Sequence, residues 1–516
     1  MAPRQDAVAF APNNAWMPAH RMARRPSVRR DDDARRARLS QGTHPPMRSQ
    51  LLIALVSLIA SLCVPAHARA SGDDYAIMHV TILPMTPDGA PIEDATLVVR
   101  DGRIAEIARP GEARLSPELE RIDGSGKWLM PGLADMHVHA LNRGYGRQVP
   151  AGQAFPADYM RTEDVMLPFI ANGVTQILEM SALPETLEQR HEIESGAALG
   201  PHIAAAAMID GDPPVWTYAA HVATTPEEGR RAVHAIAAAG FPFVKAYSQL
   251  ERPVFQAVIE EAQAAGVRVI GHVPAGSSGN AQEVLTSGFS MVAHAEEFSK
   301  LDDDPDAADI ARYAALSRRN GVWVATTLTS NVWIAEQTRD AEVIKGATGW
   351  QYVHPVLTDY WTHANRYTRD VTPKKIADRD GLVKFTRDLV REFYRQGVPM
   401  LPGTDSIIPG VVYGFSLHDE LELLSQAGIE NRRILESATR LAAEFLNVAD
   451  DRGTIEVGKA ADFILLDADP LADISNTRAI AAVVRGGRYL SRAELDSKMQ
   501  DLAARNRELA GAPDPG

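Results

Sequence analysis

Eight short apolar segments, several of them followed by a helical stretch, limit the folds open to this chain more than any other feature. They lie at residues 133–139, 174–180, 202–209, 241–247, 267–273, 291–298, 322–329 and 398–406. Short apolar strands that alternate with helices are the pattern of a parallel α/β protein. Eight such units predict a TIM-type (β/α)8 barrel over residues 132–450, with its active site at the carboxyl ends of the strands.

The segments on either side of this region read differently. Residues 71–131 and 451–492 alternate apolar and polar positions and contain the turn signals "PDG" and "RDGR". Alternation interrupted by such turns is typical of antiparallel strands. We therefore expect a small β-sandwich domain built from both ends, followed by a C-terminal helix or tail at 493–516.

The N-terminal part has the composition of an export signal. Residues 47–70 begin with Met47 and Arg48, continue with an apolar run over 51–64, and end in "PAHARA". A basic start, an apolar core and small residues at the end form a signal peptide. Because such a signal normally begins a chain, Met47 is the expected start and the Arg-rich residues 1–46 a disordered upstream extension. The predicted location is periplasmic or secreted.

Two consequences follow from removing this signal. The only cysteine, Cys63, lies inside it, so the mature protein would contain no disulfide. The first 70 residues hold 11 of the 53 basic and 4 of the 67 acidic residues, which leaves a net charge near −21. A protein this acidic is a poor partner for nucleic acid. We expect a small-molecule substrate and no membrane contact after signal removal, while the oligomeric state, a homo-oligomer included, stays open.

Metal-ligand residue types stand at the ends of five of the eight predicted strands. They are His137, His139, Lys245, His272, His294 and Asp405. Alternation along a strand places His137 and His139 on the same side, so both can point into the barrel mouth. Each residue alone is weak evidence, since a single histidine is more often a core residue and Asp405 could cap a helix. Six of them at the carboxyl ends of strands indicate one chemical site.

Lys245 is the most unusual of the six. It lies within the apolar segment "FPFVKAY", which predicts a buried strand. A buried ammonium group is costly unless it is paired, neutralised or chemically altered. The sequence therefore predicts a special function for Lys245.

The motifs carrying these residues resemble the amidohydrolase superfamily, in its binuclear-metal class. "PGLADMHVH" is similar to the opening motif of that family, and the Lys, His, His and Asp follow in the same order. The stretches "SLHDELELLSQAGIENRRILESATRLAAEFL" and "GTIEVGKAADFILLD" resemble its C-terminal part. The resemblance covers residues 74–490 and points to the imidazolonepropionase-like and prolidase-like branch.

This resemblance implies a metal centre with two divalent ions. His137, His139 and Asp405 would bind one ion, and His272 and His294 the other. Lys245 would carry CO₂ as a carbamate that bridges the two. Imidazole and carboxylate ligands suit zinc, with manganese, iron and cobalt as alternatives.

The activity implied is hydrolysis of an amide or peptide-like C–N bond by a metal-bridging hydroxide, on small substrates such as dipeptides or N-acyl amino acids. Asp405 would act as base and then acid. Tyr247 would donate to the developing oxyanion, or else be a barrel-wall aromatic. His418 would contact substrate or brace Asp405. For a dipeptidase, a cation must bind the substrate carboxylate, and Arg143 and Arg147 are candidates that could equally be solvated loop charges.

Other functions remain open on the same residues. A lactonase or phosphotriesterase could use the same metals, and a non-catalytic binding protein would be expected to have lost ligands. A mononuclear deaminase would lack Lys245 and place a Glu shortly after the strand-five histidine, but "GHVPAG" contains none. The segment 330–397 is long for a barrel connection and rich in aromatic residues. It predicts either extra helices or a lid over the substrate.

Overall fold

A computed structural model describes residues 74–140, 160–216 and 220–511, all within one compact unit that covers 69–516. The predicted upstream extension and signal peptide, residues 1–46 and 47–70, lie outside the described residues. Within the described ranges, no helix combines the length and the apolar character needed to cross a membrane.

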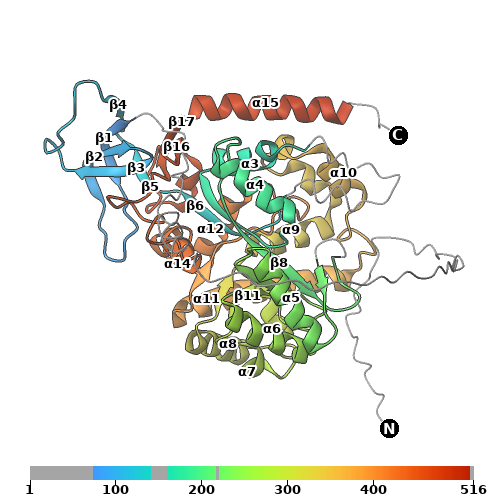
Figure 1. Cartoon of the computed structure of the whole chain (residues 1–516). Helices are drawn as coiled ribbons and strands as arrows, with labels where there is room; N and C mark the ends of the chain where they lie inside the picture. The colour runs from blue at the N-terminus through green and yellow to red at the C-terminus, as the bar shows by residue number, and fades with distance from the viewer. Residues whose placement is uncertain (1–73, 141–159, 217–219, 512–516) are drawn as a thin grey trace, which may run out of the picture. The chain divides into compact units, whose positions relative to one another are not determined.

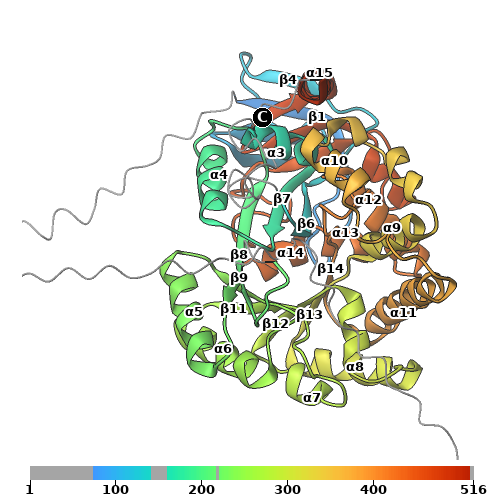
Figure 2. The same ribbon diagram turned by 90° about the vertical axis from the view of Figure 1, so that its right-hand side faces the viewer.

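Eight parallel strands form the centre of the molecule, one at each predicted apolar segment (Figure 2). They are β6 (Leu133–Val138), β7 (Val174–Glu179), β8 (His202–Asp210), β10 (Phe243–Ala246), β11 (Arg268–Gly271), β12 (Phe289–Ala293), β13 (Trp323–Ala325) and β14 (Met400–Leu401). The strands are hydrogen-bonded in sequence order, and a short β9 (Ala220–Val222) pairs with β8. The predicted TIM-type barrel is confirmed.

The last strand meets the first through a seam of single hydrogen bonds. The Met136 N–H donates to the Pro402 carbonyl at 2.9 Å. The N–H groups of Thr404 and Asp405 both donate to the His137 carbonyl, at 3.2 and 2.8 Å. The barrel is therefore closed by backbone that belongs to the predicted metal ligands.

Helices cover the outside of the strands, as α5, α6, α8 and α11 show in Figure 2. They are α3 (Thr162–Ala171), α4 (Pro184–Glu194), α5 (Pro226–Ala238), α6 (Arg252–Ala265), α7 (Ala281–Val284), η2 (Ala295–Lys300), α8 (Ala307–Asn320), α12 (Phe415–Gln426), α13 (Asn431–Ser437) and α14 (Arg440–Phe445). Their starts follow local chemistry. In α5, the Thr225 hydroxyl accepts from the Glu228 N–H at 3.3 Å, and the Glu228 carboxylate accepts from the Thr225 N–H at 3.2 Å. This reciprocal pair is a capping box.

The amino end of the barrel is filled with apolar side chains and closed by α14. Met136, Phe243 and Ile270 belong to the interior cluster, together with Phe445 of α14. The guanidinium of Arg268 lies close to two of these rings, 5.3 Å from Phe243 and 4.0 Å from Phe445. This end is packed as a core and leaves the carboxyl end for chemistry.

Both ends of the described chain join in a second sheet of eight strands (Figure 1). These are β1 (Tyr75–Ile82), β2 (Ile92–Arg100), β3 (Arg103–Ala108), β4 (Glu120–Asp123), β5 (Trp128–Pro131), β15 (Phe463–Leu466), β16 (Ile480–Arg485) and β17 (Arg488–Ser491). β4 and β5 pair with different halves of β1, on either side of an irregularity at His79. The sheet encloses its own core, including Ile77, Leu97 and Leu465. It confirms the small β domain expected from both ends, with all eight strands hydrogen-bonded into one sheet.

The long connection between β13 and β14 is helical. It contains α9 (Leu328–Arg339), η3 (Ala341–Gly346), η4 (Trp350–Tyr352), α10 (Pro355–His363) and α11 (Pro373–Gln396). α11 packs against α8, and α9 packs against α11 and α12. α10 packs against the C-terminal helix. Beyond the small sheet, η5 (Ile474–Arg478) precedes β16, and α15 (Arg492–Gly511) forms a C-terminal helix.

Candidate metal centre

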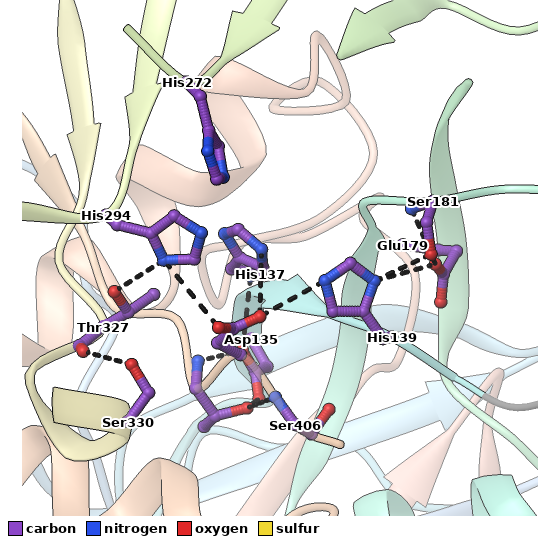
Figure 3. A network of polar contacts seen from close by, with 12 residues as sticks. Asp135, His137, His139, Glu179, Ser181, His272, His294, Thr327, Ser330 and Ser406 are labelled. Carbon is purple, nitrogen blue, oxygen red and sulfur yellow. Dashed lines mark hydrogen bonds and ion pairs between the residues drawn. The ribbon is translucent and has the colours of Figure 1, made fainter. Parts of the chain in front are cut away.

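Four imidazoles converge at the carboxyl end of the barrel (Figure 3). His137 and His139 come from the end of β6, His272 follows β11 and His294 follows β12. The ring centroids are 5.4 Å apart for His137 and His139, and 4.2 Å apart for His137 and His294. The rings of His272 and His294 are 4.9 Å apart. Four residues predicted separately thus share one site.

Asp405 completes the centre from the loop after β14. Its Oδ1 lies 3.3 Å from His137 Nε2 and 3.2 Å from His139 Nε2, and its Oδ2 lies 4.0 Å from His294 Nδ1. One ligand atom each from His137, His139 and Asp405 can be chosen so that all lie within 4.8 Å of one another. That spacing and that mixture of imidazole and carboxylate suit a divalent cation.

Left-handed backbone aims several of these side chains. Met291 and Ala293 point into the barrel interior, so strict alternation would turn His294 away from it. His294 instead has φ 81°, and Thr327 and Asp405 have φ values of 46° and 57°. Such values are uncommon for residues with a side chain and cluster at functional sites. Simple alternation in the sequence did not predict this local geometry.

One glycine lets two strand ends come close together. Gly271, directly before His272, has φ 126°, and a Cβ at this position would lie 2.2 Å from the carbonyl oxygen of Ala246. No side chain fits there. The glycine in "GHV" is therefore needed to bring His272 beside β10.

In three of the four histidines, a hydroxyl oxygen lies within hydrogen-bond distance of Nδ1. His139 Nδ1 is 2.8 Å from Ser181 Oγ, His272 Nδ1 is 2.7 Å from Ser248 Oγ, and His294 Nδ1 is 3.0 Å from Thr327 Oγ1. Contacts of this kind fix the ring orientation of metal-binding histidines. The three hydroxyl residues had not been predicted from the sequence, since Ser and Thr at strand ends carry no distinctive pattern.

Buried nitrogens without partners remain inside the cluster. Both ring nitrogens of His137, and Nε2 of His272, make no hydrogen bond with any described residue. An unsatisfied buried polar atom is costly. Metal ligation would satisfy one nitrogen of each ring, so these residues fit the divalent ions implied by the sequence.

Burial also controls the protonation of the cluster. It lowers the pKa of His294 to about 3, and it lowers the pKa values of His137 and His272 well below the ordinary range. Burial would raise the pKa of Asp405, but His294, His139 and Lys245 lower it overall. Neutral imidazole and ionised carboxylate are the metal-binding forms.

Lys245 lies at the C-terminal part of β10 and is 1% exposed. No carboxylate oxygen of a described residue lies within 4.0 Å of its Nζ, and burial lowers its pKa to about 8. Its ammonium is 5.1 Å from the ring of Tyr247. The structure thus places Lys245 beside the cluster without an ionic partner.

Tyr247 lies against the same cluster. Its ring centroid is 4.1 Å from that of His272, and the Trp216 Nε1–H donates to its hydroxyl oxygen at 2.7 Å. Burial raises its pKa, although the Trp216 hydrogen bond and the charge of Arg366 act in the opposite direction. The phenol therefore keeps its proton and can still donate it to a hydrogen bond.

His418 is the one predicted catalytic residue that the structure places elsewhere. It is buried in α12, and its Nδ1 lies 2.9 Å from Thr477 Oγ1 of η5. None of its hydrogen bonds with described residues reaches Asp405, and the contact with Thr477 joins α12 to η5. The substrate-contact or bracing role of His418 stays a prediction. The alternative carboxylate-binding candidates, Arg143 and Arg147, lie outside the described residues.

The residue that does hold the Asp405 loop is Asp135, which the sequence analysis missed. Its Oδ1 accepts from the Thr404 N–H at 3.0 Å and from the His137 N–H at 3.3 Å. Its Oδ2 accepts from the Thr404 hydroxyl at 2.7 Å. An aspartate inside the apolar strand "LADMHVH" was the available signal, because a buried carboxylate needs such partners.

Comparison with known proteins agrees with this arrangement. The pattern of the amidohydrolase family matches residues 128–490, most of the chain. The chain belongs to the amidohydrolase family. It is accordingly a hydrolase that acts on C–N bonds, in a family that uses divalent metal ions.

Individual relatives refine the position within the family. An imidazolonepropionase from Cupriavidus metallidurans is 25% identical over 466 residues, covering 83% of this chain and 98% of the relative. A 5'-deoxyadenosine deaminase from Methanosarcina acetivorans is 32% identical over 123 residues, which are 21% of this chain and only 28% of that relative. The solved structure of a Xaa-Pro dipeptidase with bound methionine in the active site has a TM-score of 0.63 at 20% identity, covering 81% of this chain and all of that one. The amidohydrolase thus resembles an imidazolonepropionase over most of its length and shares its fold with a Xaa-Pro dipeptidase.

Proposed function

We propose that this amidohydrolase uses two divalent metal ions, most simply zinc, to hydrolyse small amides such as dipeptides or N-acyl amino acids. The observation that carries the proposal is the cluster of three buried imidazoles, the half-buried His139 and Asp405 next to Lys245, which has no carboxylate of a described residue in range. His137, His139 and Asp405 would hold one ion, and His272 and His294 the second. The ring nitrogens of His137 and His272 that lack a hydrogen bond with any described residue could serve as ligand atoms for these ions.

Lys245 would bridge the two ions as a carbamate. Its neutral amine attacks CO₂, forms an N–C bond and releases one proton, which leaves an anionic carboxylate at the end of the stem. Burial, without a carboxylate of a described residue in range, favours the neutral, reactive amine over an ammonium. The modification would replace a costly buried cation by an anionic ligand.

Two other residues would transfer protons and donate hydrogen bonds during the reaction. Bound ions would lower the pKa of a water molecule and polarise the substrate carbonyl. Asp405 would accept the proton of the attacking water and pass it to the leaving amine. Tyr247, oriented by Trp216, would donate its hydroxyl proton to the oxygen that gains charge.

A lactonase or phosphotriesterase activity is the second candidate, because the same ligands would serve ester substrates. The deaminase relative covers a short segment, and Lys245 at the cluster favours the binuclear hydrolase. A non-catalytic protein would be expected to have lost metal ligands, whereas this chain keeps all six candidates.

The experiment is an assay of the metal-loaded protein against dipeptides, N-acyl amino acids, cyclic amides, lactones and phosphotriesters. We expect two metal ions per chain and the highest kcat/KM on the linear amides. Turnover of lactones or phosphotriesters alone would favour the second candidate. A fully metal-loaded protein that hydrolyses none of the amides would refute the proposed function.

We further propose that the protein is exported, on the basis of the signal-like residues 47–70. Mass spectrometry of protein from its native host should find the N-terminus close to Ser71. Detection of residues 1–46 on the mature protein would rule out this export route.

A further inference from the structure

Arg366 lies in the long connection between β13 and β14, after α10 and before α11. Its side chain is exposed, yet it is surrounded by aromatic groups. Its Nη2–H donates to the Tyr367 hydroxyl at 2.9 Å. Its Cζ lies 5.0 Å from the ring centroid of Tyr367 and 5.5 Å from that of Trp216.

A chain of contacts joins this guanidinium to the metal centre. Trp216, which Arg366 faces, donates to the Tyr247 hydroxyl at 2.7 Å. The Tyr247 ring in turn lies 4.1 Å from that of His272. The charge of Arg366 also acts on the Tyr247 phenol. Arg366 therefore belongs to the same side of the site as the proposed oxyanion donor.

Arg366 has no ionic partner among the described residues and makes its side-chain contacts with aromatic groups. No carboxylate of a described residue lies within 4.0 Å of its guanidinium. In the same connection, Arg339 pairs with Glu336 at 2.8 Å, and the exposed Arg369 donates to the Ala364 carbonyl at 3.2 Å. A guanidinium held by aromatic faces keeps free N–H groups in the fork that matches a carboxylate.

We propose that Arg366 binds the carboxylate of the substrate and so selects amino-acid amides that end in a free acid. This inference rests on the proposed function and names its substrate class. It assigns to Arg366 the role that the sequence analysis considered for Arg143 and Arg147. It also gives part of the 330–397 segment a function at the substrate, in line with the lid alternative.

The test compares each N-acyl amino acid with its carboxamide, which has the same shape and no charge. Wild-type protein should prefer the acid. Arg366→Gln should lower kcat/KM for the acid by about 10- to 100-fold, mainly through KM, because a charge-assisted bond is lost. The carboxamide should change by less than about threefold. Arg366→Lys should recover part of the preference, since it keeps the charge but not the fork.

Arg369→Gln is the matched control, since Arg369 is an exposed arginine three residues away without a link to Tyr247. It should keep the wild-type preference. Metal content and circular dichroism of both variants exclude misfolding as a cause. Equal losses on the acid and the carboxamide in Arg366→Gln, or no loss on either, would overturn the inference while leaving the proposed function intact.

A binding measurement tests the inference independently of turnover. Free amino acids and their amides are titrated calorimetrically into the metal-loaded wild type and Arg366→Gln. The wild type should bind the acids more tightly than the amides, and the variant should lose that difference. Failure of all C–N hydrolysis would refute the proposed function alone, whereas identical acid binding by both proteins would refute the role of Arg366.

Discussion

Lys245 and Arg268 are cations on adjacent strands of one barrel, but their surroundings are opposite. Arg268 begins β11 at the amino end, where its guanidinium lies against Phe243 and Phe445 and donates to the Phe445 carbonyl. Lys245 lies two residues beyond Phe243 on β10, buried among imidazoles without a carboxylate of a described residue in range. The protein therefore supplies contacts that stabilise the charge of Arg268 but none of this kind for Lys245.

The same contrast extends to the two ends of the barrel. At the amino end, Phe243 and Phe445 stack with an interplanar angle of 4° and close the interior. At the carboxyl end, His137 and His272 hold nitrogens that no described residue satisfies. Because unsatisfied buried polar atoms destabilise a fold, a group of them is expected where a ligand supplies the missing contacts.

The largest effect should follow from replacing Lys245. Lys245→Ala would remove a ligand from both ions, so metal content should drop and activity should fall by several orders of magnitude. Added short carboxylic acids should partly restore both by occupying the bridge, and bicarbonate should speed metal loading of the wild type. Lys345→Ala, a surface lysine paired with Glu342, is the control. A Lys245→Ala variant that binds two metals and stays active would show that Lys245, like Arg268, is a structural cation and not a metal ligand.

The hydroxyl next to His294 should have an intermediate effect. Thr327→Val keeps the shape of the side chain but removes the oxygen 3.0 Å from His294 Nδ1. Loss of such a contact typically lowers metal affinity or activity by about 10- to 100-fold. Competition with a metal chelator measures the affinity. Thr386→Val, which removes another buried hydroxyl away from the site, should leave it unchanged.

Replacing Arg268 should affect stability and not catalysis. Arg268→Met would lose two cation–π contacts and one hydrogen bond, a cost of about 2 to 3 kcal/mol. The melting temperature should fall, while metal content and kcat/KM stay at wild-type values. A loss of metal without a loss of stability would contradict the division between the two ends of the barrel.

The smallest effect concerns His418 and depends on pH. Burial lowers its pKa to about 3, with the charge of Arg478 adding to the effect. Between that value and its unfolded pKa near 6.5, the unfolded chain binds more protons, so stability falls as the pH falls. His418→Gln should remove about 2 kcal/mol of the loss between pH 7 and pH 5. Unfolding curves measure this, and a large fall in kcat/KM would support the catalytic role predicted from the sequence.

The barrel could be predicted because each strand is an apolar run, and a fully buried parallel strand requires one. The ends of the strands were harder to predict. The segment predicted at 398–406 contains only the short strand β14 (Met400–Leu401), because it meets β6 through separate hydrogen bonds and not through a continuous ladder. The cluster of candidate metal ligands was predictable from their places at strand ends. The contacts of Asp135 and Thr327 were not, since a polar residue in or near an apolar strand does not reveal which groups it binds. Arg366 was hidden for a different reason: it lies far along the chain from Trp216 and Tyr247, and only folding brings them together.

The seam between β6 and β14 couples assembly of the fold to loading of the site. The carbonyl of His137 holds the amides of Thr404 and Asp405, while the side chains of His137 and Asp405 face the same candidate ion. An ion that binds the closed barrel more tightly than the open one stabilises closure. The stabilisation equals the difference between the two binding free energies. In deuterium exchange, those two amides should therefore be protected most when metal is present. If the site binds an ion, closure of the barrel and metal binding are two measures of one equilibrium.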